Sequence, residues 1–232
     1  MDAANPDGTP MIPRTGYLVE FNALWYNALM FLQEIYDGVA EEQTNVARWK
    51  AISLKAKTAF VDTFLNDYGY LYDYVNGTYT DLSVRPNMVI AVGIDYSPLD
   101  RRQRKVALDV ITRELLTPKG LRTLSPKSFG YNPWYVGNPE QRERAYFTGS
   151  ARPWLMGFYS YAYVKVFGMG GISFVERMMI GFEDEMKEGG IGTLSELYDG
   201  NPPFTGRGAI SFAANVGHIC WVLRLLKNLD VV

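Results

Sequence analysis

The chain has 232 residues, of which 47% are hydrophobic and 21% charged, a composition typical of globular proteins and unlike that of disordered or fibrous chains. The formal net charge is -2 and lysine and arginine form no extended run, so nothing indicates a nucleic-acid partner. One cysteine and one histidine exclude an internal disulfide and a Cys/His zinc site, and we expect neither a metal nor a cofactor.

Hydrophobic periodicity predicts an all-α chain without convincing strands. The first helix is expected over residues 16–38, with an inward-facing stripe formed by Leu18, Phe21, Trp25, Ala28, Leu29, Leu32 and Ile35. A second helix is expected over residues 41–66, followed by a turn-rich aromatic segment. Further helices are expected at residues 86–92, 97–115, 153–167, 172–188 and 208–228. Since no break in composition divides the chain, we treat residues 1–232 as a single domain.

The connections between these helices differ in length and composition. The segment from Thr117 to Thr148 is rich in proline and glycine and is too long for a simple connection, which predicts a functional loop. Residues 168–171 contain three glycines, but no strand precedes them, so a turn between helices is favoured over a phosphate-binding loop. His218 lies among apolar residues of the last helix, and a packed histidine is favoured over a catalytic base.

No stretch reaches the roughly 18 uninterrupted apolar residues of a membrane span. The N-terminus also lacks the basic and apolar parts of a signal peptide, so we expect a cytoplasmic protein without a membrane partner. Aromatic residues make up 14% of the chain, which is high. Such residues fill cores, but they also line carbohydrate clefts, because the C–H faces of sugars stack on aromatic rings.

The segment "GTLSELYDG" (192–200) supports two interpretations of Glu196. Thr193 and Glu196 have the spacing of a capping box, in which a hydroxyl and a carboxylate satisfy the free N–H groups of a helix start. Glu196 is also a candidate for one half of a catalytic carboxylate pair. The two roles are compatible, because a helix that starts at Thr193 would aim the carboxylate and favour its ionised form.

Five segments resemble, in the same order, the C-terminal amylo-alpha-1,6-glucosidase domain of glycogen debranching enzymes. The resemblance covers essentially the whole chain. The segments are "PRTGYLVEFNALWYNAL" (13–29), "VRPNMVIAV" (84–92), "LLTPKGLRTLSP" (115–126), "AYFTGSARPWLMGFYSYAY" (145–163) and "GGIGTLSELYDGNPP" (189–203).

The resemblance implies an (α/α)6 toroid with a sugar pocket at one end of the inner helices. It further implies inverting hydrolysis of α-1,6-linked glucose at branch points of glycogen or limit dextrin. In such chemistry one carboxylic acid protonates the glycosidic oxygen and a carboxylate about 6.5–9.5 Å away activates water. By matching motifs, the acid is Asp2 and the base is Glu196, and the partners are α-glucans such as glycogen, limit dextrin and maltooligosaccharides.

The resemblance also suggests a set of substrate-binding residues. Glu20 and Asn27 are seven residues apart, share one helix face and are expected to point into the cleft together. Trp25 and Trp154 fit core packing equally well, and Arg85 could instead cap a helix or pair with Asp81. The complete set is Arg14, Glu20, Trp25, Asn27, Arg85, Asn87, Tyr146 and Trp154.

The chain departs from the family pattern in two respects. The family domain begins well before its catalytic aspartate, which implies a C-terminal fragment with about seven or eight of twelve helices. We expect the fragment alone to be inactive, because no structure around Asp2 holds it in the position that catalysis requires. The apolar helix faces that the missing helices would cover make self-association a second expectation. Phe147, Thr148 and Arg152 replace residues of the family's His-Gln-Gly-Thr-Val-Trp-Pro-Trp motif. The alternatives are therefore a non-catalytic α-glucan-binding paralogue or another α-glucosidase of the same fold.

Overall fold

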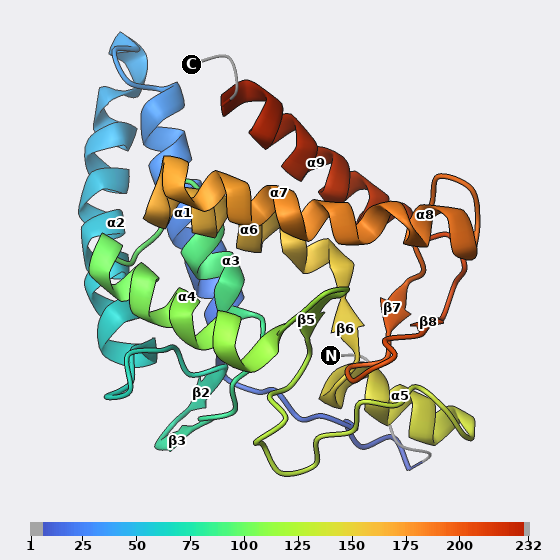
Figure 1. Cartoon of the computed structure of the whole chain (residues 1–232). Coiled ribbons are helices and arrows are strands. Elements are labelled where there is room, and N and C mark those ends of the chain that lie inside the picture. The colour runs from blue at the N-terminus through green and yellow to red at the C-terminus, as the bar shows by residue number, and fades with distance from the viewer. Residues whose placement is uncertain (1–6, 230–232) are drawn as a thin grey trace.

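The computed structural model describes residues 7–229 and is mainly helical (Figure 1). Asp2, the expected catalytic acid, lies outside the described residues. The helices are α1 (Val19–Ile35), α2 (Gln43–Phe64), α3 (Met88–Gly93), α4 (Arg101–Leu115), α5 (Pro139–Thr148), α6 (Met156–Phe167), α7 (Met169–Glu183), α8 (Glu185–Glu188) and α9 (Ala213–Leu229), with 3-10 turns η1 (Ala40–Glu42) and η2 (Pro153–Leu155).

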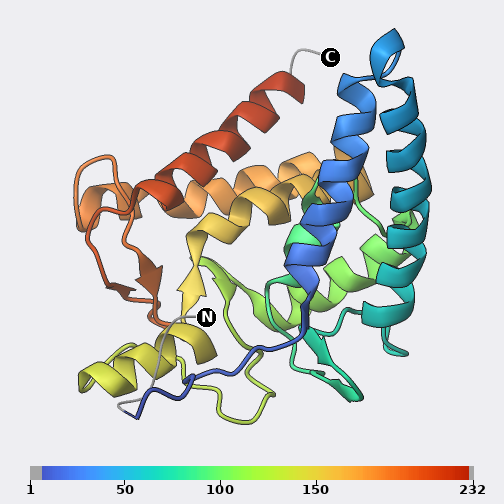
Figure 2. The same ribbon diagram turned by 180° about the vertical axis from the view of Figure 1, so that it is seen from behind.

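The longer helices form two layers. α1, α6 and α9 are in front in Figure 2, with α3 packed between α1 and α6. On the opposite side, seen in Figure 1, α2 packs against α1, α4 against α3 and α6, and α7 against α6 and α9. This alternation of inner and outer helices fits the (α/α)6 type of fold expected from the resemblance, while the expected fragment with about seven or eight of twelve helices remains a prediction.

Two small antiparallel sheets correct the expectation of a chain without strands. Their strands have only two or three residues, too few to show a period-2 pattern in sequence. One sheet has the order β1-β2-β3 and the other the order β4-β5-β6-β7-β8. The strands are β1 (Tyr17–Leu18), β2 (Tyr74–Asn76), β3 (Tyr79–Thr80), β4 (Leu116–Thr117), β5 (Gly120–Arg122), β6 (Ala151–Arg152), β7 (Leu197–Tyr198) and β8 (Gly206–Arg207).

The expected loop over residues 117–148 also contains a helix, α5. Its start is a capping box: the side chain of Asn138 accepts a 2.8 Å hydrogen bond from the Gln141 backbone N–H, and the side chain of Gln141 accepts one from Asn138. Pro139 occupies the first helical position, which suits its fixed backbone and missing N–H. These start signals were hidden by the many prolines and glycines of the segment.

Other helix boundaries shift by a few residues. α4 starts at Arg101 rather than at Pro98, because Asp100 accepts a hydrogen bond from the backbone N–H of Gln103 and caps the helix. The helix expected over residues 172–188 is divided between α7 and α8, and the last helix begins at Ala213. Within residues 7–229, none of the helices combines the length and the apolar character needed to cross a bilayer.

The buried face of α1 is not the predicted stripe. Phe21, Trp25 and Ile35 are 64%, 57% and 51% exposed. The helix is apolar on two sides, and its neighbours α2 and α3 cover one of them within the described part of the chain. The residues that it buries are Val19, Ala23, Tyr26, Leu29 and Gln33.

Candidate active site

The pairing of β6 with β7 brings a distant arginine and glutamate together. Ala151 lies opposite Tyr198 in this antiparallel pair, which places Arg152 and Glu196 at the same end of it. Nη1 of Arg152 is 3.9 Å from Oε1 of Glu196, and the two side chains are 11% and 20% exposed. Charges that are partly shielded from water interact more strongly than charges on the open surface.

Both carboxylate oxygens of Glu196 accept hydrogen bonds from the protein. The hydroxyl of Tyr146 donates to Oε1 at 2.9 Å, and the backbone N–H of Ala209 donates to Oε2 at 3.1 Å. The N–H of Glu196 donates in turn to the carbonyl of Ala209 at 2.8 Å. The carboxylate is therefore held in one orientation directly before β7.

The predicted capping box at Thr193 is wrong, because no helix follows this residue. The segment instead runs into β7, which pairs with β8. The hydroxyl of Thr193 lies 2.7 Å from the hydroxyl of Ser211 and does not cap a helix. Strand pairing, which the local spacing could not reveal, thus determines where the carboxylate of Glu196 points.

Gly208 leaves the space that the carboxylate of Glu196 occupies. Its φ of +71° is a left-handed conformation that favours glycine. A β-carbon at this position would lie 2.6 Å from Oε2 of Glu196 and 3.0 Å from its β-carbon. Any larger residue would displace the carboxylate or the loop before Ala209.

Tyr146, near the end of α5, connects Glu196 with Arg152. The guanidinium of Arg152 lies over the Tyr146 ring, 3.5 Å from its centroid, which is a close cation–π contact. Burial raises the pKa of the Tyr146 hydroxyl and the carboxylate of Glu196 adds to this, although Arg152 acts in the opposite direction. The hydroxyl therefore keeps its proton at neutral pH and serves as a donor to Glu196.

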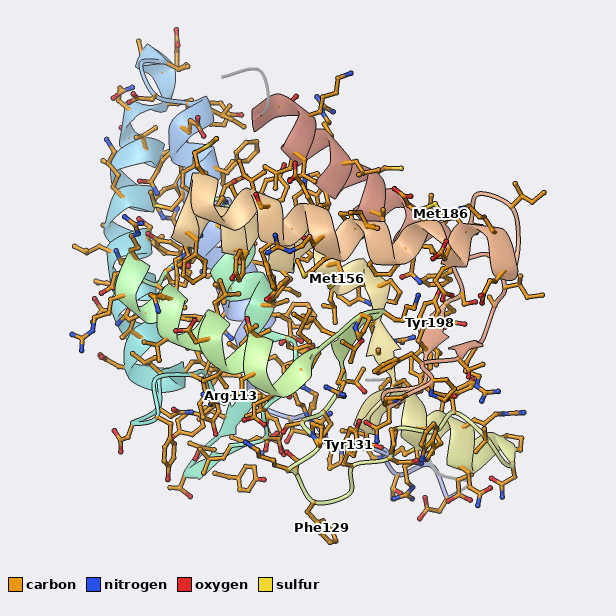
Figure 3. The ribbon with its side chains drawn as sticks, viewed as in Figure 1. Arg113, Phe129, Tyr131, Met156, Met186 and Tyr198 are labelled. Carbon is orange, nitrogen blue, oxygen red and sulfur yellow. The ribbon has the colours of Figure 1, made fainter. Side chains whose placement is uncertain are left out.

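The buried side chain of Asn215 fixes the backbone on the other side of Glu196. Its Nδ2 donates to the carbonyl oxygens of Ser195 at 2.6 Å and Glu196 at 3.0 Å. Its Oδ1 accepts a 3.0 Å hydrogen bond from the backbone N–H of Trp154. The Trp154 ring packs edge-on against His218, so Trp154 connects Asn215 with the aromatic rings around His218. Figure 3 shows the same region, with Tyr198 on β7 and Tyr131 close to α5.

A second polar cluster gathers four of the expected substrate-binding residues around a buried aspartate, Asp73. Nε of Arg14 donates to Oδ2 of Asp73 at 2.6 Å, and its two terminal nitrogens donate to the carboxylate of Glu20 at 2.7 and 2.8 Å. Asn87 donates to Oδ1 of Asp73 at 2.7 Å. The side chains of Arg14 and Asp73 are 5% and 1% exposed. The fourth expected residue, Arg85, also contacts Asp73.

Arg85 connects this cluster with the site around Glu196. Its Nε lies 4.0 Å from Oδ2 of Asp73, while Nη1 donates to the carbonyl oxygens of Phe147 at 2.9 Å and Thr123 at 3.3 Å. Phe147 directly follows Tyr146 in α5. The two roles considered from sequence, a helix cap and a pair with Asp81, are not seen.

Two expected substrate-binding residues of α1 make other contacts. Trp25 lines a hollow of about 410 Å³ between α1 and α2, together with residues such as Tyr17 and Phe60. Oδ1 of Asn27 accepts a 3.0 Å hydrogen bond from the backbone N–H of Tyr96. Since Glu20 binds Arg14, the contacts of Glu20 and Asn27 do not converge on a shared cleft.

His218 is packed among aromatic rings, in line with the expectation from sequence. Its ring centroid lies 5.7 Å from that of Trp154, 5.6 Å from that of Phe158 and 5.6 Å from that of Trp221. Burial lowers the pKa of His218.

No group of three or more His, Cys, Asp or Glu side chains within residues 7–229 is arranged to hold a metal ion.

Three residues of these clusters were not proposed from sequence as functional. Asp73 and Asn215 are single polar residues in apolar surroundings and carry no motif of their own. Arg152 was noted only as a departure from the family pattern. Its place beside Glu196 depends on the β6–β7 pairing, which has no local sequence signal.

Comparison with known families identifies the chain. The family model described as amylo-alpha-1,6-glucosidase matches residues 1–221. The chain belongs to this family. The resemblance inferred from five ordered segments is thereby confirmed, and members of the amylo-alpha-1,6-glucosidase family are glycoside hydrolases. A comparison with curated proteins gives no significant match.

Solved structures with a similar fold include other sugar hydrolases. Neutral trehalase Nth1 from Saccharomyces cerevisiae matches 91% of this chain with a TM-score of 0.64 and 12% identity, over 40% of the trehalase. GH63 mannosylglycerate hydrolase from Thermus thermophilus in complex with glucose matches 90% of this chain with a TM-score of 0.61 and 13% identity, over 44% of that chain. Such low identity establishes the fold alone. The chain spans less than half of the length of these structures.

Proposed function

We propose that the chain supplies the general base, Glu196, of an inverting α-1,6-glucosidase that removes glucose from branch points of glycogen or limit dextrin. The observation that carries the proposal is the carboxylate of Glu196, held by Tyr146 and the Ala209 N–H and flanked by Arg152. Membership of the amylo-alpha-1,6-glucosidase family supports the choice of linkage.

The proposed chemistry needs two carboxyl groups on opposite sides of the sugar. Asp2, which the family motif assigns as the acid, protonates the glycosidic oxygen. Glu196 takes a proton from a water molecule that attacks the anomeric carbon from the other face, so the configuration inverts. Each carboxylate oxygen has two acceptor positions, so Glu196 can bind this water while it keeps its hydrogen bonds to the protein.

The other expected residues have supporting roles in this proposal. Arg14, Glu20, Arg85 and Asn87 form the cluster around Asp73, and Arg85 links this cluster to α5, which carries Tyr146. Tyr146 binds the carboxylate of Glu196 directly, and Trp154 is linked to the backbone of Glu196 through Asn215. Trp25 and Asn27 remain proposed substrate-binding residues, although Trp25 lines the hollow between α1 and α2 and Asn27 binds the backbone of Tyr96.

The stereochemical course of glucose release tests the proposal. The natural protein that contains these residues is incubated with a glycogen limit dextrin, and the anomer of the first glucose is followed by proton NMR. β-Glucose from α-1,6 linkages is expected. Release of α-glucose, or hydrolysis of trehalose or mannosylglycerate in preference to the dextrin, would contradict it and favour another hydrolase of this fold.

A second candidate function is binding of α-glucan without hydrolysis. It is favoured by the observation that both oxygens of Glu196 already accept hydrogen bonds and that Arg152, a departure from the family pattern, lies beside them. Calorimetry with maltooligosaccharides separates the two functions. Saturable binding without any release of glucose supports this candidate, whereas absence of binding excludes it.

A further inference from the structure

Two hollows lie next to each other along α4 in the outer layer, and they share Tyr68. One has a volume of about 380 Å³ and is lined by Tyr68, Val110 and Lys127 among others. The other has a volume of about 440 Å³ and is lined by Tyr68, Gln103 and Val106 among others. Val106, Val110 and Arg113 follow one face of α4, so the hollows form one groove, the α4 groove.

Tyr68 stands between the two hollows with its ring open to solvent. It is 72% exposed, so much of the ring surface is available to a ligand. Its ring stacks on that of Tyr70, with centroids 6.2 Å apart and an angle of 24° between the planes. The hydroxyl of Tyr70 donates to the carbonyl of Leu82 at 2.8 Å, which anchors this platform.

A buried carboxylate holds hydrogen-bond donors in place beside the platform. The side chain of Glu114 is 8% exposed, and its Oε1 accepts hydrogen bonds from Lys127 at 2.7 Å and Arg113 at 3.1 Å. Its Oε2 accepts one from Ser125 at 2.9 Å. Lysine and arginine have three and five N–H donors, so most of them remain available to a ligand. Figure 3 shows Arg113 on α4 and Phe129 at the tip of the loop after Lys127.

The charges in the α4 groove are balanced. Asp67, Asp100 and Arg102 line the hollow beyond Tyr68, while Arg113, Glu114 and Lys127 line the other. Such a mixture does not favour a strongly charged ligand of either sign. An exposed aromatic ring flanked by fixed polar groups instead suits a neutral sugar chain, whose C–H faces stack while its hydroxyls form hydrogen bonds.

We propose that the α4 groove is a non-catalytic binding site for a linear oligosaccharide, with one sugar unit stacked on Tyr68 and its neighbours in the two hollows. None of the residues that line it takes part in the contacts around Glu196. The choice of an α-1,4-glucan as the oligosaccharide rests on the proposed function. The groove would hold one outer chain of a branched substrate while another chain of the same substrate reaches Glu196.

The test is an NMR titration of the chain with maltoheptaose, monitored at the methyl groups of Val106 and Val110, which line the groove. Saturable shifts are expected at these methyls, and the Tyr68→Ala variant should bind about tenfold more weakly. Tyr79→Ala is the matched control, because Tyr79 is also exposed (56%) but lies on β3 outside the groove. Its affinity should equal that of the unchanged chain.

The outcomes separate this proposal from that for Glu196. Groove shifts that depend on Tyr68 support the site even if no glucose is ever released from limit dextrin. Equal affinity of Tyr68→Ala and Tyr79→Ala, or no saturable shift with maltoheptaose, would overturn it. Shifts caused by inorganic phosphate but not by maltoheptaose would assign Arg113 and Lys127 to an anion and would overturn it as well.

Discussion

The hydroxyl of Tyr146 donates a 2.9 Å hydrogen bond to Oε1 of Glu196, although the two residues are 50 positions apart in the chain. Tyr146 is in turn covered by the guanidinium of Arg152. A hydrogen bond to a charged acceptor contributes more than one between neutral groups. The relationship therefore orients the proposed base, and it can be tested by removing a single oxygen atom.

In the natural protein, Tyr146→Phe should lower kcat by about ten- to hundredfold, because a hydrogen bond to a charged group contributes about 1.5–3 kcal/mol. KM for limit dextrin should change little, since the ring and its contact with Arg152 remain. Steady-state kinetics on limit dextrin measures both. Tyr135→Phe, which alters a neighbouring ring without a bond to Glu196, should leave kcat unchanged. An equal kcat for both variants would contradict the positioning role of Tyr146.

In the natural protein, Gly208→Ala should impair catalysis through Glu196, because a β-carbon at this position would lie 2.6 Å from Oε2. Gly192→Ala is a matched control: both glycines have a φ of +71°, but nothing lies within 4 Å of a β-carbon at position 192. Both variants should lose about 1 kcal/mol of unfolding free energy from backbone strain. Only Gly208→Ala should lower kcat, and an equal loss of activity in the control would argue against steric positioning of Glu196.

Arg14→Met should lower the unfolding free energy by about 3–5 kcal/mol, because Glu20 loses its ion-pair partner and the buried carboxylate of Asp73 keeps only Asn87 and the more distant Arg85. Urea denaturation with linear extrapolation gives the value. Lys105→Met removes an ion pair with Asp109 whose side chains are 53% and 50% exposed, and it should cost less than about 1 kcal/mol. Similar costs for the two variants would show that the cluster around Asp73 adds no special stability.

His218 should make stability fall as the pH drops below about 6.5, its pKa in the unfolded chain. Burial lowers the pKa of His218 in the folded protein, so the unfolded chain binds the proton first and the folded state is disfavoured. The urea midpoint should therefore be lower at pH 5.5 than at pH 7. His218 is the sole histidine in the sequence, so His218→Gln should reduce this difference. If the pH dependence of stability is unchanged in the variant, it arises from carboxylates and not from His218.

The exposed apolar side of α1 should cause the chain to self-associate. Phe21, Trp25 and Phe31 are 64%, 57% and 52% exposed along this helix, and apolar surface of this kind favours contact with another molecule. Light scattering should give a mass above the 26.2 kDa of one chain, and Phe21→Lys should lower it. Leu54→Lys on α2, where Leu54 is 69% exposed, is the control. A monomeric mass for the unchanged chain would contradict the expectation.

The sequence predicts the longer helices well. Helical periodicity located α1, α2, α4 and α6 within a few residues, because long amphipathic segments carry a strong signal. The buried face of α1 differs from the predicted one, because α1 is apolar on two sides and periodicity does not say which side a neighbour covers. α5 was missed because proline and glycine around it resemble a loop.

The arrangement around Glu196 depends on contacts between distant segments. Glu196 itself was proposed from a motif, but its capping box was inferred from spacing and proved wrong. Its partners Tyr146, Arg152 and Ala209 come from α5, β6 and the segment after β8, and no local pattern connects them. The role of Asp73 could not be predicted from the sequence for the same reason, because a single aspartate has no motif and its partners are known only from the structure.

The measurement that tests the central claim most directly is glucose release from glycogen limit dextrin by the natural protein and by its Glu196→Gln variant. Glutamine keeps the shape of the side chain but cannot accept a proton, so release should fall by about two to four orders of magnitude. Glu188→Gln, a change at an exposed glutamate of α8, should keep full activity. If Glu196→Gln folds normally and releases glucose at the original rate, Glu196 is not the catalytic base.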